Sequence, residues 1–148
     1  MLCPDWTDPR NVGSAFRLAD AAGISELVLA GTTPRPPNAR IRKTARSTER
    51  SVPYRYVEDA RAWVQEAREA GATVVALEIT DRSESLFAFD PPPGPIILIA
   101  GAERTGIDAE LLACCDHAVH LPMYGTNTSM NVAVALGAAV YLLLMKLE

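Results

Sequence analysis

The stretch IILIAGAERTGIDAELLACCDHAVHLPM, residues 96–123, decides the fold of this chain. The apolar run at 96–101 is typical of a buried strand, and a second strand is predicted over 117–122. Between them, Asp108 is placed to cap a short helix over 108–114. A strand, a helix and a strand in direct succession form the unit that builds parallel sheets, so the stretch predicts an α/β protein.

The same alternation extends through the rest of the chain. Further strands are predicted over 1–3, 26–31, 53–57 (an edge strand) and 73–79. Further helices are predicted over 11–22, 58–70 and 129–146. Segment 32–51 is rich in Pro and Arg and is expected to be a long loop with one short helix. No repeat or linker is visible, so residues 1–148 are predicted to form a single domain, a mostly parallel sheet with helices on both faces.

Composition narrows the class of protein. The chain has 148 residues, of which 49% are hydrophobic, as expected of one globular domain. Its longest apolar run, 132–145, is shorter than the roughly 20 residues of a membrane span, and no signal peptide is visible, so a cytoplasmic protein is expected. The odd cysteine count, with Cys114 and Cys115 adjacent, argues against a disulfide framework. His117 and His120 lack partners at zinc-ligand spacing, so no metal site is predicted.

Basic residues are concentrated in one segment. Seven of the 14 lie between Arg35 and Arg55, where Glu49 is the only acidic residue, although the net charge is −4. Phosphate contacts act through nearby charge because salt screens distant charge, so this segment is compatible with binding phosphate groups. A solvated loop is the interpretation that composition alone favours. The candidate phosphate contacts are Arg40, Arg42, Lys43 and Arg46.

Polar residues gather where strands end. Gly31, Gly101 and residues 121–125 lie at the carboxyl ends of predicted strands, and ligands of parallel sheets bind at that edge. Ser129 and Asn131 begin the closing helix and therefore face the same edge. Ser129 is expected to cap this helix through its hydroxyl. Capping by Ser129 leaves Asn131, in front of an apolar run, without an explanation.

Three stretches carry a family resemblance: NVGSAFRLADAAGI at 11–24, the stretch at 96–123, and SMNVAVALGAAVY at 129–141. In this order and spacing they resemble the three motifs of the SpoU/TrmH-type RNA ribose 2′-O-methyltransferases of the SPOUT superfamily. KTARSTERSVPY at 43–54 looks like the variable RNA-facing region of that family. The resemblance implies a C-terminal trefoil knot that forms a pocket for S-adenosyl-L-methionine. It also implies a homodimer, packed through the apolar helix at 131–145, with the active site completed at the interface.

The resemblance also assigns site residues. The cofactor contacts that it implies are Leu77, Gly101, Leu121 and Met130. Gly101 is expected because a backbone close to a ligand leaves no room for a side chain. The catalytic positions that it implies are Arg17, Asn11, Glu103, Ser129 and Asn131.

Two of these roles stay open at this point. In the family, Arg17 is the residue proposed as the base that takes the ribose proton. A guanidinium rarely loses its own proton, so binding the adjacent phosphate and stabilising a developing alkoxide is the safer interpretation. Glu103 is expected either to order its loop or to orient Arg17.

The sequence therefore predicts an S-adenosylmethionine-dependent methyltransferase acting on a ribose 2′-hydroxyl in tRNA or rRNA. An inactive RNA- or cofactor-binding module on the same scaffold is the second hypothesis, and a nucleotide-binding α/β protein without RNA is the third. Arg17 and Asn131 favour the enzyme, because an inactive copy has no need of both. Reversing the charge of the basic segment distinguishes the third hypothesis from the first two. RNA binding is lost on charge reversal only if RNA is a partner.

Overall fold

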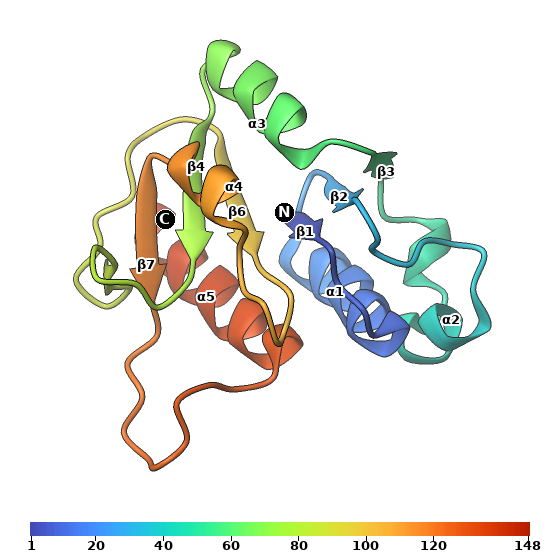
Figure 1. The fold of residues 1–148 in the computed structure, drawn as a ribbon. Helices are drawn as coiled ribbons and strands as arrows, with labels where there is room; N and C mark the ends of the chain where they lie inside the picture. Colours follow the sequence, from blue (N-terminus) through green and yellow to red (C-terminus); the bar gives the residue numbers. More distant parts are fainter.

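The protein forms one seven-stranded sheet in a computed structural model that describes residues 1–148 (Figure 1). The strand order is β3-β2-β1-β6-β4-β7-β5, and all paired strands are parallel. The strands are β1 Leu2–Pro4, β2 Leu27–Ala30, β3 Tyr54–Val57, β4 Thr73–Leu77, β5 Glu84–Ser85, β6 Ile96–Ala100 and β7 His117–His120. The predicted parallel sheet is confirmed, and β3 lies at its edge as expected.

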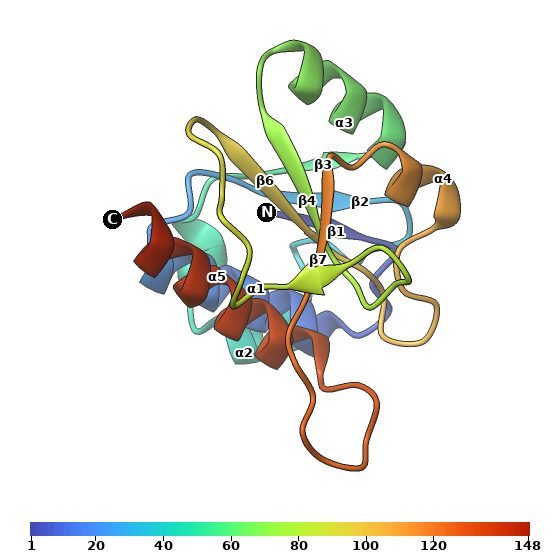
Figure 2. The ribbon, with the colours of Figure 1, turned by 90° about the vertical axis from the view of Figure 1, so that its left-hand side faces the viewer.

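Helices cover both faces of this sheet, as predicted. They are α1 Pro9–Ala22, α2 Ala39–Ala45, α3 Ala60–Glu69, α4 Ala109–Ala113 and α5 Val132–Leu147, with a 3-10 helix at Thr48–Arg50. Figure 2 shows α3 and α4 on one side of the sheet and α1, α2 and α5 on the other. Neighbouring strand residues therefore enter different cores. Leu98 packs with the α1 and α5 side, and Ile99 with the α3 and α4 side.

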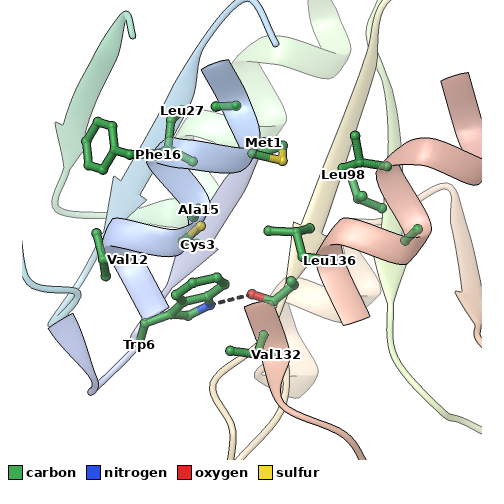
Figure 3. Close-up of a cluster of buried hydrophobic side chains, with 14 of the residues drawn as sticks. Met1, Cys3, Trp6, Val12, Ala15, Phe16, Leu27, Leu98, Val132 and Leu136 are labelled. Atoms are coloured by element: carbon green, nitrogen blue, oxygen red, sulfur yellow. Dashed lines mark hydrogen bonds between the residues drawn. The ribbon is translucent and has the colours of Figure 1, made fainter. Parts of the chain in front are cut away.

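Trp6 links two central strands, β1 and β6, at the carboxyl edge of the sheet. This residue follows β1, is buried, and donates its indole Nε1–H to the Ala100 carbonyl at the end of β6, at 2.8 Å. Figure 3 shows its ring beside Val132 and Leu136 of α5. Trp6 thus fixes the carboxyl ends of β1 and β6 against the start of α5.

The residues that cap the helices agree only in part with the capping residues expected from the sequence. Asp8 caps α1 by accepting from the Arg10 amide, and Gly23 ends that helix in the left-handed conformation, at φ 65°. Helix α5 begins at Val132 with Asn131 as its cap, so the expectation that Ser129 caps it is wrong. Asp108 does precede α4, but its side chain makes no capping hydrogen bond.

The structure contains two short elements that the sequence did not predict, a 3-10 turn in segment 32–51 and the strand β5. Segment 32–51 contains one short α-helix, α2, as predicted, and also a 3-10 turn. The two-residue strand β5 pairs with β7 and was not predicted. No helix combines the length and apolar character that crossing a bilayer requires. The trefoil knot remains a prediction of the family resemblance.

Candidate active site

A cavity of about 470 Å³ opens at the carboxyl edge of the sheet, among the ends of β4, β6 and β7 and the start of α5. All four residues expected to contact a cofactor line it: Leu77, Gly101, Leu121 and Met130. Glu103 and Ser129 line it as well. The cavity therefore lies where the strand order places a ligand site.

The loop after β6 forms one wall of this cavity. It folds back on itself, and the Gly106 amide donates to the Ala102 carbonyl at 2.8 Å. A side chain on Gly101 would lie 2.5 Å from the Ile107 nitrogen. Gly101 is therefore required by the return of its own loop, and the close approach of a ligand, for which the sequence suggested a glycine, stays a prediction.

Glu78 holds that loop in place. Its Oε2 accepts from the Ile107 amide at 2.9 Å, and its Oε1 accepts from the Ile79 amide at 3.2 Å. Ordering the loop was one of two roles expected of Glu103, and Glu78 performs it. Sequence reasoning missed Glu78, although its position directly after β4 is the signal that would have found it.

A network of three side chains joins the three motif segments. Asn11 of α1 donates Nδ2–H to Glu103 Oε1 at 2.6 Å, and Asn131 donates to the same oxygen at 3.2 Å. Asn131 Nδ2 also lies 3.2 Å from Asn11 Oδ1, which accepts from it. Asn11 is buried, whereas Glu103 and Asn131 are exposed. These contacts explain why all three motifs carry a polar residue at this edge.

Asn131 has a second task in the same position. Its Oδ1 accepts from the amides of Ala133 and Val134 at 2.9 and 3.2 Å, which caps α5. The carboxamide therefore stabilises the helix start through its oxygen and positions Glu103 through its nitrogen. A serine at this position has no amide group with which to do both.

Two predicted catalytic residues stay outside the network. Arg17 is exposed on α1, and the four ion pairs of the chain use other arginines. Glu103 contacts the two asparagines and not Arg17, so the expectation that it orients Arg17 within one chain is wrong. Ser129 lines the cavity without a hydrogen bond of its own.

His120 is a titratable side chain of the cavity that was not among the predicted site residues. His120 lines the cavity at the end of β7, and its Nδ1 lies 2.9 Å from Ser83 Oγ.

Elsewhere in the chain, three groups have raised pKa values. The hydrogen bonds to Asp8 raise the pKa of Arg10, with a smaller contribution from Glu103. Burial raises the pKa of Cys3 and Cys115 to about 12, so neither thiol is poised as a nucleophile. No group of three or more metal-ligating side chains is present.

The candidate RNA contacts lie on α2. Arg40, Arg42 and Lys43 are exposed there, with Arg46 ending the helix in the left-handed conformation. The opposite side of α2 is buried against α1, and Thr44 Oγ1 donates to the Arg10 carbonyl at 2.8 Å. This contact docks the positively charged surface of α2 against α1, the helix that carries Asn11.

Comparison with known proteins identifies the class. Residues 2–141 match the SpoU rRNA Methylase family, and the chain belongs to that family. The 23S rRNA (guanosine-2'-O-)-methyltransferase RlmB of Pseudomonas aeruginosa is 31% identical over 135 residues, which are 91% of this chain and 54% of RlmB. The chain thus spans about half the length of the curated relatives it matches.

Solved structures agree with this assignment. The SpoU methyltransferase AviRb from Streptomyces viridochromogenes, in complex with AdoMet, superposes with a TM-score of 0.87 at 29% identity, over 98% of this chain and 58% of AviRb. A structure reported for the 2-OH methylation of C/U34 on tRNA superposes with a TM-score of 0.83 at 27% identity. That alignment covers 99% of this chain and 93% of the other.

Proposed function

We propose that this chain transfers a methyl group from S-adenosyl-L-methionine to a ribose 2′-hydroxyl of tRNA or rRNA. The observation that carries the proposal is the contact of Asn11, Glu103 and Asn131 beside one cavity. These residues are far apart in the chain, and each belongs to a different motif. Because tRNA and rRNA are the proposed substrates, we infer a cytoplasmic location.

The cavity suits the proposed cofactor in size and in chemistry. Its volume of about 470 Å³ is within the roughly 300–1,000 Å³ typical of small-molecule sites. Leu77, Leu121 and Met130 offer apolar contacts for the adenine ring and the methionine chain of this cofactor, and the loop after β6 offers backbone groups for its polar edges. When bound, S-adenosyl-L-methionine supplies an activated methyl group on a sulfonium.

Glu103 is the residue best placed to meet the ribose. Its Oε1 is occupied by the two asparagines, whereas its Oε2 makes no hydrogen bond. We infer that Oε2 accepts a hydrogen bond from the ribose 2′-hydroxyl and so aims the 2′-oxygen at the methyl group. As the oxygen–methyl bond forms, Oε2 takes the hydroxyl proton, and the methyl–sulfur bond breaks to leave the sulfur as a neutral thioether. Asn11 and Asn131 hold the carboxylate still, and such positioning supplies much of the acceleration in a displacement reaction.

Arg17 fits a role as phosphate ligand. A guanidinium carries a positive charge and a fork of N–H donors, so Arg17 binds the phosphate beside the target ribose and stabilises negative charge developing on the 2′-oxygen. Its position outside the network of its own chain supports an active site that a second copy completes.

An exposed apolar stripe on α5 supports that homodimer. Val134, Tyr141 and Met145 lie on one side of the helix, with 61%, 53% and 65% of their surface exposed. Tyr141 donates to the Ala21 carbonyl of α1 at 3.4 Å, and α1 lies beside α5 in Figures 1 and 2. Arg17 is one turn before Ala21 on the same side of α1. Pairing of two chains through α5 would therefore bring Arg17 of one chain close to the active site of the partner subunit.

RNA binding is proposed for the exposed basic surface of α2. Its docking on α1 would guide the RNA backbone toward the helix that carries Asn11 and Arg17. The contacts would be made by Arg40, Arg42, Lys43 and Arg46, none of which forms an ion pair within the chain.

The experiment combines cofactor binding with methyl transfer. Calorimetry measures binding of S-adenosyl-L-methionine, and radiolabelled cofactor is then incubated with bulk RNA from a strain that lacks this protein. We expect binding and acid-precipitable label, with label lost in Glu103→Gln. Cofactor binding without transfer to any RNA would favour the inactive binding module, and no cofactor binding would contradict the proposal.

A further inference from the structure

A second cavity, of about 540 Å³, lies within the basic segment. Asn38, Arg42, Glu49, Arg50 and Tyr54 line it together with three small or proline residues. It shares no lining residue with the cavity at the sheet edge. The proposed function leaves it without a role.

Glu49 is the unusual member of this cavity. It is the only acidic residue between positions 27 and 57, yet it forms no ion pair with the arginines around it. Its Oε2 is the only buried side-chain oxygen or nitrogen of the chain without a hydrogen-bond partner. A buried carboxylate oxygen without a donor is costly, so the cavity is short of a donor. Rotation about the last side-chain torsion of a glutamate is easy, so the carboxylate can turn until both of its oxygens face the cavity.

The other lining residues match the parts of a nucleotide. Tyr54 is 38% exposed, and its ring is held edge to face by Phe16 at 5.2 Å, which leaves it as a fixed stacking surface. Asn38 Oδ1 is occupied in capping α2, whereas its Nδ2 makes no hydrogen bond. Arg42 and Arg50 are exposed and unpaired, which suits a phosphate.

We propose that this cavity binds one unstacked guanine nucleotide of the RNA, distinct from the nucleotide that is methylated. The proposal rests on the proposed function, in that RNA is the substrate. The Glu49 carboxylate accepts from guanine N1–H and N2–H, and Asn38 Nδ2 donates to guanine O6. Tyr54 stacks on the base, and the two arginines hold its phosphate.

Guanine is preferred because of how its donors are arranged. Its Watson–Crick edge presents two adjacent N–H donors, which match the two oxygens of a carboxylate. Adenine, cytosine and uracil present one donor beside an acceptor that repels the second oxygen. Specificity of this kind comes from matched hydrogen bonds, and each bidentate pair discriminates by about fivefold or more.

The test follows backbone amide signals of the whole chain by NMR during titration with 5′-GMP, 5′-UMP or inorganic phosphate. We expect 5′-GMP to shift the signals of Asn38, Glu49 and Tyr54 at lower concentration than 5′-UMP. Glu49→Gln should weaken 5′-GMP binding about fivefold or more and leave 5′-UMP binding unchanged. Tyr54→Phe keeps the stacking surface and should bind normally, whereas Tyr54→Ala should bind weakly.

Other outcomes would overturn this assignment. Equal affinity for phosphate and 5′-GMP would define a phosphate site without base recognition. An unchanged 5′-GMP affinity in Glu49→Gln, or shifts confined to the cavity at the sheet edge, would also contradict it. Binding of S-adenosyl-L-methionine is measured in the same samples. Its failure alone would contradict the proposed function, and failure of 5′-GMP alone would contradict only the guanine subsite.

Discussion

At the scale of single residues, the site depends on one carboxylate held by two amides. Asn11 and Asn131 both donate to Glu103 Oε1, which leaves Oε2 free. The same arrangement explains a carboxamide at the front of an apolar helix, because Asn131 caps α5 with its other end. A single polar residue thus connects the stability of α5 with the geometry of the proposed reaction.

Asn131→Asp separates those two tasks. An aspartate keeps an oxygen that caps α5 but removes both Nδ2 contacts and places a second negative charge beside Glu103. We expect the methyl-transfer rate to fall about 100-fold or more, as when one positioned hydrogen-bond donor is removed from an active site. Asn131→Ala is the control, because it should lose about 1 kcal/mol of helix capping as well. Transfer rates and thermal unfolding measure the two effects, and a near-normal rate in Asn131→Asp would contradict the assigned role.

Arg17 calls for a graded substitution. Lysine keeps the positive charge but loses the planar fork that binds a phosphate through two hydrogen bonds. We expect Arg17→Lys to transfer methyl groups more slowly than the unmodified chain and faster than Arg17→Ala. Affinity for S-adenosyl-L-methionine should be unchanged in both variants, because Arg17 lines no part of the cavity of its own chain. Loss of cofactor affinity in either variant would contradict the role of Arg17 as a ligand of the RNA phosphate.

At the scale of secondary-structure elements, apolar patterning determined what the sequence could predict. The strands β2, β4 and β6 are largely buried apolar runs, so their positions were predictable to within a residue or two, and β7, in which only Val119 is buried, was predicted equally well. The two residues of β5 carry no such pattern, because their pairing depends on β7 alone. The start of α5 was misplaced because Ser129 and Asn131 are both good capping residues. Only the distant contact with Glu103 distinguishes them.

The exposed stripe on α5 gives a prediction at this scale. Val134→Glu places a charge in the middle of the proposed interface, so we expect a monomer in light scattering and strongly reduced methyl transfer. Ala62→Glu, on the exposed side of α3, is the matched control and should leave both unchanged. A Val134→Glu dimer with normal activity would show that α5 is not the interface.

At the scale of the whole molecule, the candidate site is a product of the fold. The resemblance supplied Asn11, Glu103 and Asn131 as separate positions, but local sequence rules could not show that they touch. Their contact depends on the parallel order that brings β6 beside β1 and seats α5 against α1. Glu78 was missed although its position directly after β4 indicated it, and the buried oxygen of Glu49 was missed because burial and the lack of a hydrogen-bond donor follow from the packing of the folded segment.

A site shared between two copies predicts rescue between two inactive variants. Arg17→Ala and Asn131→Asp are each expected to be almost inactive alone. When the two chains are unfolded and refolded together in equal amounts, about half of the dimers are mixed, and each mixed dimer holds one intact site. We expect about a quarter of the unmodified activity. Absence of any recovery, with mixed dimers present, would place both residues in the site of one chain.

The position of the methyl group on the RNA tests the central claim most directly. RNA labelled by this chain is hydrolysed with alkali, which cleaves after every ribose with a free 2′-hydroxyl. The account predicts that all label appears in alkali-resistant dinucleotides, and that none appears when Glu103→Gln replaces the unmodified chain. Label in mononucleotides would mean methylation of a base, and would contradict a site built around the ribose hydroxyl.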